Sequence, residues 1–395
     1  MVNLDFRFAH TPRILFGAGT FARLPEVLAG FGRSALIVTG SRSLAESGRL
    51  SEFLLALSER GVAAATVAVQ GEPSTELVDQ IVTGHGQPLP DVVAAIGGGS
   101  VLDTGKAVSA MLPSGESVTD YLEGVGHGRP HPGRKVPLVA VPTTAGTGSE
   151  ATKNAVISRV GRDGGFKKSL RHDRFVPDVA LVDPELAMSC PPHITAACGL
   201  DAFTQLLESY VSTAASPLTD ALAWSGLARL KDSLIPALRE GRRNLPSRAG
   251  MAYAALLSGI TLTNAGLGVV HGLASPLGAA FPIPHGVVCG TLVGVATRTN
   301  VDRILARPEK YPQALEKYAR VGRLLAGHRS ETPADDCRRL LMIIDRWVRE
   351  TVMPRLGDYG IGADDLDSLA AAAGIKNNPV PLDKIDLRRL LSARL

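Results

Sequence analysis

Short apolar runs alternate with amphipathic stretches in the first half of the chain, from residue 34 to about residue 185. The runs lack the polar alternation of half-exposed strands, so they are typical of strands buried on both faces of a parallel sheet. Segments such as 49–60 and 76–83 lie between them with helical spacing, which completes a βαβ rhythm. We therefore predict an α/β half with a parallel sheet of the nucleotide-binding type and strands at 35–38, 65–69, 92–96, 138–141 and 179–182.

The pattern changes after Pro191 and Pro192, where long helical segments begin and no strand is predicted. We expect an all-α second half with helices at 202–213, 218–240, 249–264, 312–326 and 335–352. This change predicts two domains, residues 1–188 and residues 189–395. The stretch 112–137 is rich in Gly, Pro and His, which predicts a long surface loop, a short hairpin or a lid that helps to shape a pocket.

Composition and charge narrow the classes of protein. The 42 basic and 38 acidic residues are interspersed and leave a net charge of only +4, without the basic stripe that nucleic-acid binding needs. The N-terminal segment lacks the apolar core of a signal peptide, and no apolar run reaches the roughly 18 residues of a membrane span. We therefore expect a cytoplasmic protein that binds neither nucleic acid nor membrane.

The four cysteines are scattered and form no C-x-x-C pair or dense framework. We therefore interpret Cys190, Cys198, Cys289 and Cys337 as reduced thiols of the core rather than as disulfides.

A glycine-rich turn joins a predicted strand to a predicted helix in DVVAAIGGGSVLDTGKAVSA. Gly97, Gly98 and Gly99 permit positive φ and let backbone N–H groups approach an anion, and the helix N-terminus adds partial positive charge. These features predict a binding site for a pyrophosphate group. Because the segment matches neither G-x-G-x-x-G nor a P-loop, a plain strand-to-helix turn is the alternative.

A second turn, in VPLVAVPTTAGTGSEAT, is dense in hydroxyl groups. Hydroxyls at this density can bind ribose, amide or phosphate groups, although they also pair routinely with nearby backbone. The hydroxyl residues are Thr143, Thr144, Thr147, Ser149 and Thr152.

The second half contains a candidate set of metal ligands. His271 and His285 lie in VVHGLASPLGAAFPIPHGVVCG, and neutral imidazoles suit Zn²⁺ or Fe²⁺. Asp201, in CGLDAFTQLLESYVS, would add one carboxylate. In the alternative interpretation Asp201 caps its helix and both histidines are satisfied interior groups, and the long spacings leave both interpretations open.

Taken together, these segments resemble the iron-containing (group III) alcohol dehydrogenase family. The shared motifs run in order through RILFGAG, GGGSVLDTGKA, PTTAGTGSE, VALVDPEL, GLDAFTQLLESYVS, HGLASPLGAAFPIPHG and NNPVPLDKIDLRRLL. The resemblance implies an α/β nicotinamide-cofactor domain over residues 1–188 and an all-helical metal- and substrate-binding domain over residues 189–395, in the fold shared with dehydroquinate synthase. It also implies a homodimer.

The resemblance further implies where the nicotinamide cofactor binds. The pyrophosphate would lie on the glycine-rich turn, the threonine-rich turn would add contacts, and Lys167 matches the family lysine that reaches the nicotinamide ribose. The expected cofactor-binding residues are Gly40, Ser41, Arg42, Gly98, Gly99, Ser100, Asp103, Thr143, Thr144, Thr147, Ser149, Lys167 and Leu186. Gly40 stands where NAD-preferring relatives often have Asp, and Arg42 can contact the 2′-phosphate of NADP. We therefore expect NADP as the cofactor, with NAD as the alternative. In the alternative interpretation of Arg42, its side chain is simply solvated at the surface.

For the metal, the resemblance implies Fe²⁺, with Zn²⁺ as the alternative, held by Asp201, His271 and His285. Two positions depart from the family pattern. Gln205 replaces a ligand histidine, so the site has three ligands or uses Gln205 as a weaker fourth. Ser275 replaces a histidine near the nicotinamide, which puts proton relay in doubt and makes the pocket roomier.

The function implied is metal-dependent, NAD(P)-linked hydride transfer between a small alcohol and its aldehyde or ketone, with Asp201, His271 and His285 acting through the metal. Three alternatives stay open: a lyase similar to dehydroquinate synthase, a metal-free reductase of the maleylacetate reductase type, and a non-catalytic cofactor-binding protein.

Overall fold

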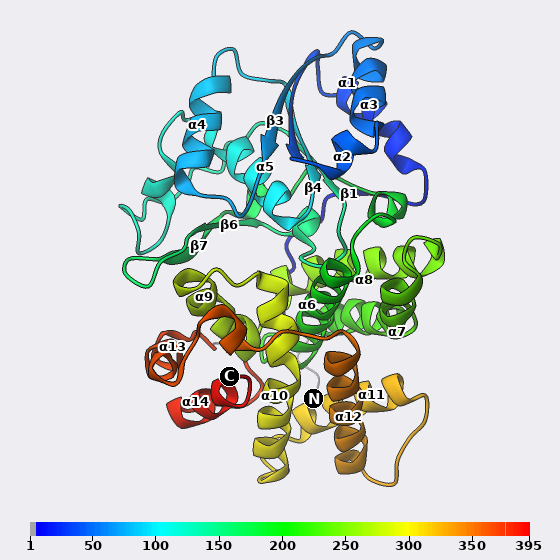
Figure 1. Ribbon diagram of the computed structural model, residues 1–395, viewed down its shortest axis with the longest axis vertical. Helices are drawn as coiled ribbons and strands as arrows, with labels where there is room; N and C mark the ends of the chain where they lie inside the picture. Colours follow the sequence, from blue (N-terminus) through cyan, green and yellow to red (C-terminus); the bar gives the residue numbers. More distant parts are fainter. Residues whose placement is uncertain (1–4, 376) are drawn as a thin grey trace.

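The computed structural model describes residues 5–375 and 377–395. Residues 1–4, which begin the segment on which we based the expected absence of a signal peptide, lie outside the described residues. An α/β half occupies the upper part of Figure 1 and a helical half, which includes the C-terminus, the lower part.

Six parallel strands form the central sheet in the order β1-β8-β5-β4-β2-β3. The five predicted strands are confirmed, and the sequence pattern missed only the sheet's edge strand β1, whose residues are largely exposed. The bounds are β1 Arg13–Phe16, β2 Ser34–Gly40, β3 Ala63–Val69, β4 Val92–Gly97, β5 Leu138–Pro142 and β8 Val179–Val182. The expectation that every strand is buried on both faces is wrong for β3, which lies at the other edge and is mostly exposed.

Helices cover both faces of the sheet because successive strand residues point to opposite sides. Leu36 and Val38 pack with the helices α4 (Thr75–His85) and α5 (Gly99–Met111). On the other face, Ala35 and Ile37 pack with α1 (Leu24–Ala29) and α3 (Arg49–Ser58), next to the short α2 (Ser43–Glu46). The predicted parallel α/β fold is therefore confirmed.

An antiparallel hairpin of β6 (Asn154–Arg159) and β7 (Phe166–Arg171) lies beneath the sheet, next to α9 (Figure 1). This hairpin was not predicted, because neither strand is a continuous apolar run. The stretch 112–137 is a loop as expected, with a single 3₁₀ turn at Val118–Tyr121.

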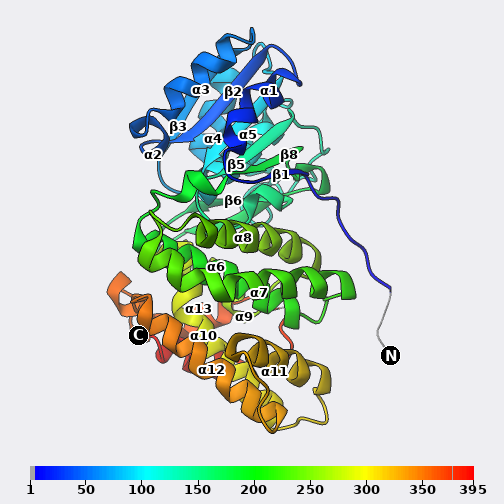
Figure 2. The ribbon, with the colours of Figure 1, turned by 90° about the vertical axis from the view of Figure 1, so that its right-hand side faces the viewer.

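The second half contains no strand among its described residues, as predicted. Figure 2 shows α8 facing the sheet half, with α6 and α7 in the next layer and α10, α11 and α12 farther away. The helices are α6 Pro192–Val211, α7 Pro217–Glu240, α8 Leu245–Ala265, α9 Val269–Ala280, α10 His285–Leu305, α11 Pro312–Ala326, α12 Pro333–Glu350, α13 Leu366–Ala372 and α14 Lys384–Ser392.

Among the described residues, no single helix has both the length and the apolar character of a membrane span. The helices α8 and α9 reach that criterion only as a pair, across a bend of 98°.

Candidate metal and cofactor site

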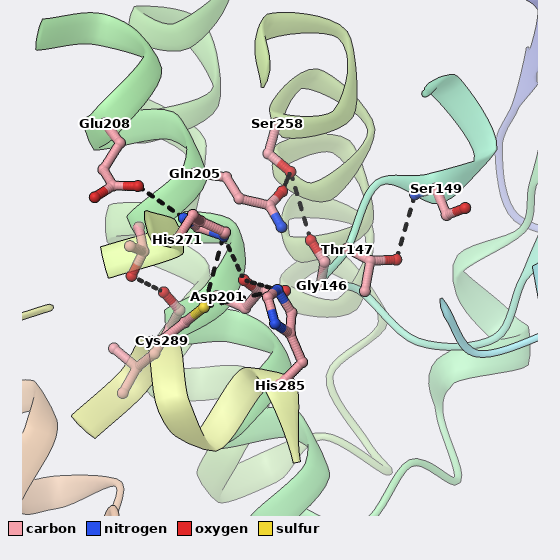
Figure 3. A network of polar contacts seen from close by, with 12 residues as sticks. Gly146, Thr147, Ser149, Asp201, Gln205, Glu208, Ser258, His271, His285 and Cys289 are labelled. Atoms are coloured by element: carbon pink, nitrogen blue, oxygen red, sulfur yellow. Dashed lines mark hydrogen bonds and ion pairs between the residues drawn. The ribbon is translucent and has the colours of Figure 1, made fainter. Parts of the chain in front are cut away.

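Three helices bring the predicted metal ligands together, as Figure 3 shows. Asp201 comes from α6, His271 from α9, and His285 is the first residue of α10. The Asp201 Oδ1 atom is 3.4 Å from His271 Nε2 and 3.6 Å from His285 Nε2. The alternative in which Asp201 caps its helix is wrong, because α6 begins at Pro192 and Asp201 lies buried in its interior.

Two buried polar atoms of this cluster, the Asp201 Oδ1 atom and the His285 Nδ1 atom, have no hydrogen-bond partner among the described residues. Leaving a buried polar group unpaired costs about 1–3 kcal/mol, so such groups call for an explanation. One carboxylate and two imidazoles are donors that suit Fe²⁺ or Zn²⁺. The unpaired carboxylate oxygen therefore fits the divalent cation that the sequence implies.

Glu208 fixes the orientation of His271. The His271 Nδ1 atom is 2.7 Å from Glu208 Oε2, while Glu208 Oε1 accepts a hydrogen bond from the backbone N–H of Val270 at 2.7 Å. With its Nδ1 proton directed to Glu208, the imidazole turns Nε2 toward Asp201, an arrangement typical of metal-binding histidines. Glu208 was not predicted as a site residue, although it lies two helical turns after Asp201 on the same helix, α6.

Cys289 also faces the cluster. Its Sγ atom is 3.6 Å from His271 Nε2 and 3.7 Å from His285 Nε2. The side chain is fully buried, as expected for a core thiol, but its contact with both imidazoles was not predicted. The signal in the sequence was the four-residue spacing from His285, which places both residues on one face of α10.

The protonation states of the cluster follow from burial and charge. Burial lowers the pKa of His285 to about 4 although Asp201 opposes the shift, so this imidazole is neutral near pH 7. For Asp201, burial raises the pKa, but the two histidines outweigh it and the pKa is lowered. Burial acts to lower the pKa of His271, but Cys289, Asp201 and Glu208 raise it well above its usual value. A bound cation would displace the His271 proton.

A cavity of about 280 Å³ joins this cluster to the glycine-rich turn. It therefore brings together residues that are far apart in the sequence and that belong to both halves of the chain. The predicted residues that line it are Gly99, Ser100, Asp103, Thr147, Ser149, Thr152, Lys167, Gln205, His271, Ser275 and His285.

Other predicted cofactor residues lie outside this cavity. Thr143 and Leu186 line a second cavity of about 150 Å³. Neither cavity is lined by Gly98, Thr144 or the segment 40–42, where β2 ends and Arg42 is exposed. The expectation that the loop 112–137 shapes the substrate pocket is wrong, because none of its residues lines the 280 Å³ cavity.

The glycine-rich turn opens α5, whose first residue is Gly99 and whose N-cap is Gly98. None of Gly97, Gly98 and Gly99 has a positive φ, so that part of the expectation is wrong. Close approach is what requires glycine here, because a Cβ atom on Gly99 would lie 2.6 Å from Thr147 Cγ2. The two predicted turns therefore pack directly against each other.

Two lysines near the cavity are held by buried contacts. Lys167 Nζ donates to both oxygens of Glu72 at 2.7 and 2.8 Å, and both residues line the cavity. Lys106 is fully buried and donates to the Ser149 carbonyl and hydroxyl oxygens at 2.8 and 3.0 Å. Neither Glu72 nor Lys106 was identified from the sequence.

Asp103 and Gln205 line the cavity with their oxygens already engaged. Asp103 accepts hydrogen bonds from Ser149 Oγ at 2.5 Å and from the Val156 backbone N–H at 3.0 Å. Gln205 Oε1 accepts a hydrogen bond from Ser258 Oγ at 2.6 Å.

Comparison with known proteins places this geometry in a family. A model of iron-containing alcohol dehydrogenases matches residues 11–184, and a model of the C-terminal part of the Fe-containing alcohol dehydrogenase family matches residues 195–395. The chain belongs to the iron-containing alcohol dehydrogenase family. The resemblance and the predicted reaction class, metal-dependent NAD(P)-linked oxidoreduction of alcohols and aldehydes, are confirmed.

The individual relatives that match this dehydrogenase agree with the family assignment. Alcohol dehydrogenase 4 of Saccharomyces cerevisiae (strain YJM789) is 32% identical over 92% of this chain and 90% of its own length. An NADPH-dependent butanol dehydrogenase of Clostridium saccharobutylicum is 30% identical over 97% of this chain and 96% of its own length. An NAD-dependent methanol dehydrogenase of Bacillus methanolicus is 30% identical over 92% of this chain and 91% of its own length. The structure of a 1,3-propanediol oxidoreductase matches with a TM-score of 0.88 and 28% identity over 99% of this chain and 100% of its own.

Proposed function

We propose that Asp201, His271 and His285 hold the catalytic metal ion, Fe²⁺ with Zn²⁺ as the alternative, beside the nicotinamide end of the cofactor. The observation that carries this proposal is the unpaired, buried Asp201 Oδ1 atom between two imidazole Nε2 atoms. The cavity next to them also reaches the N-terminus of α5, which favours an anionic pyrophosphate.

The ion, when bound, supplies a Lewis acid for the substrate oxygen, and the cofactor supplies the hydride chemistry. The chain supplies position and charge. Glu208 holds His271 with its Nε2 atom toward the site, and the neutral His285 presents a lone pair. Lys167 is held by Glu72 at the cavity wall, where we propose that it contacts the nicotinamide ribose.

We propose that the cofactor contacts are those expected from the sequence, some of which line the two cavities while Gly98, Thr144 and the segment 40–42 lie outside them. Gly98, Gly99 and Ser100 would receive the pyrophosphate. The resemblance implied that Leu186 lies near Lys167, but Leu186 lines the second cavity with Thr143, where we propose that the adenosine end binds. Because relatives of similar identity use NADPH or NAD, the choice between them rests on Gly40 and the exposed Arg42, which favour NADP.

For Gln205 we propose a role in positioning the substrate rather than in metal binding, because its Oε1 atom already accepts a hydrogen bond from Ser258. Ser275 lines the same cavity and leaves room for the substrate where the family pattern has a larger imidazole. A small alcohol or aldehyde is the expected substrate.

At the level of the whole chain we propose a cofactor domain over residues 1–188, a metal and substrate domain over residues 189–395, a cytoplasmic location and a homodimer. The dimer has support in the edge strand β1, which exposes Ile14 and Phe16 beside an unpaired row of backbone groups. Light scattering of the purified chain tests the dimer.

The test of the function is a purification without oxygen, followed by measurement of bound Fe and Zn and of NADPH and NADH oxidation with a panel of small aldehydes. We expect aldehyde-dependent oxidation that a chelator abolishes and added Fe²⁺ or Zn²⁺ restores. A higher rate with NADPH that falls in Arg42→Ala supports the cofactor choice. Full turnover by metal-free protein contradicts the proposal and favours the metal-free reductase.

A further inference from the structure

We propose that the sulfur of Cys289 is a fourth protein ligand of the metal ion. It would replace the histidine ligand of the family pattern, whose position is occupied by Gln205 in this chain. The inference rests on the proposed function only in requiring that Asp201, His271 and His285 bind a metal. It adds a donor of different chemistry to that site.

Four of the six distances among the donor atoms are close to those around a single tetrahedral ion. With metal bonds of about 2.0–2.2 Å to nitrogen and oxygen and about 2.3 Å to sulfur, tetrahedral ligand atoms lie roughly 3.3–3.6 Å apart. The Cys289 Sγ atom lies 3.6 and 3.7 Å from the two imidazole Nε2 atoms, and the Asp201 Oδ1 atom lies 3.4 and 3.6 Å from the same two atoms. All four donors lie within 4.8 Å of one another.

A second observation points to a ligand at this place. Asp201 is only 1% exposed, and its Oδ1 atom faces the imidazoles and the thiol without accepting a hydrogen bond. A cation at this place satisfies the carboxylate oxygen, and the Cys289 Sγ atom lies within reach of the same cation. A cation bound by all four side chains requires the sulfur as thiolate, with its proton released to solvent.

The position of Cys289 leaves room for the substrate. His271 and His285 line the 280 Å³ cavity, whereas Asp201 and Cys289 do not, so the sulfur approaches from the protein interior (Figure 3). The cavity side stays open, and zinc sites can expand to five ligands during catalysis.

A thiolate ligand also changes the preferred metal. Thiolates are soft donors that select zinc, and zinc already binds nitrogen and oxygen sites more tightly than ferrous iron does. We therefore expect Cys289 to raise the preference of this centre for Zn²⁺ over Fe²⁺.

The test compares the full-length wild type with Cys289→Ser, and uses Cys337→Ser as the matched control because Cys337 is equally buried but lies in α12. Each protein is stripped of metal, then titrated with Co²⁺ for its absorption spectrum and with Zn²⁺ against a competing chelator. We expect a sulfur-to-cobalt charge-transfer band in the wild type and in Cys337→Ser but not in Cys289→Ser. The affinity of Cys289→Ser for Zn²⁺ should fall by more than the roughly 10- to 100-fold typical of changes outside the ligand shell.

A measurement on the wild type alone keeps the inference testable if Cys289→Ser does not fold. X-ray absorption at the zinc edge should show one sulfur at about 2.3 Å. Bound zinc without sulfur in its first shell overturns the Cys289 assignment and leaves the proposed function intact. A wild type that binds neither Co²⁺ nor Zn²⁺ nor Fe²⁺ overturns both.

Discussion

At the scale of single residues, the candidate metal centre depends on a side chain that does not line the cavity. Glu208 accepts a hydrogen bond from His271 and one from the Val270 backbone, so Glu208→Gln removes the charge that orients the imidazole. Changes at such positions typically reduce metal affinity or activity by about 10- to 100-fold. We expect a loss of this size, measured as kcat/KM for aldehyde reduction and as Zn²⁺ affinity by chelator competition.

The matched control for this prediction is Glu316→Gln, because Glu316 is half exposed and pairs with Arg323 on the helix α11. It should retain wild-type kinetics and metal affinity. If Glu208→Gln bound metal and turned over as the wild type does, the orienting role of Glu208 would be wrong.

At the scale of elements, the first turn of α5 is where we propose that the cofactor's pyrophosphate binds. In Gly99→Ala the new Cβ atom would lie 2.6 Å from Thr147 Cγ2 and push the two turns apart. We expect the Kd for NADPH to rise by at least about tenfold, together with a loss of about 1–3 kcal/mol in the free energy of unfolding. Fluorescence titration and denaturant unfolding measure the two effects.

The control is Gly84→Ala in α4, where an added Cβ atom meets nothing within 4 Å. It should leave cofactor binding unchanged and stabilise the helix by up to about 1 kcal/mol. Wild-type affinity for NADPH in Gly99→Ala would mean that the pyrophosphate does not lie on this turn.

The elements also show what the sequence can and cannot predict. Strands such as β4 and helices such as α7 follow from buried apolar runs and long periodic segments. The strand β1 and the β6–β7 hairpin lack those patterns, and α9 carries an internal Pro276 that reads as a break.

The residues of the site likewise divide into those that the sequence predicts and those that it does not. His271 and His285 were identified through motifs, whereas the contacts of Glu208 and Cys289 depend on how three helices pack, which spacing within one helix does not specify.

At the scale of the whole molecule, the junction of the two halves carries a buried carboxyl group. Glu150 lies two residues after Gly148. Gly148 packs so closely on α8 that an added Cβ atom would lie 2.4 Å from the Ala255 carbonyl oxygen. Burial raises the pKa of Glu150 from its usual 4.5 to about 7. The folded state therefore binds this proton more tightly than the unfolded state, and the associated stability is lost as the pH rises from about 4.5 to about 7.

Glu150→Gln removes this titration while preserving the shape of the side chain. At pH 8 we expect the variant to exceed the wild type in free energy of unfolding by about 3 kcal/mol, with the difference disappearing below about pH 4.5. Urea unfolding at several pH values measures both curves. If the unfolding free energies of the two proteins changed in parallel from pH 4.5 to pH 8, Glu150 would not be a group whose titration changes the stability in this range.

The metal content of Asp201→Asn tests the central claim most directly. The protein is purified without oxygen beside the wild type and beside Asp232→Asn, a control at an exposed position of α7. We expect stoichiometric metal in the wild type and the control, and little metal and no aldehyde reduction in Asp201→Asn, with its circular dichroism unchanged. Wild-type metal content in Asp201→Asn would contradict the proposed metal site, because the ion would then be held elsewhere.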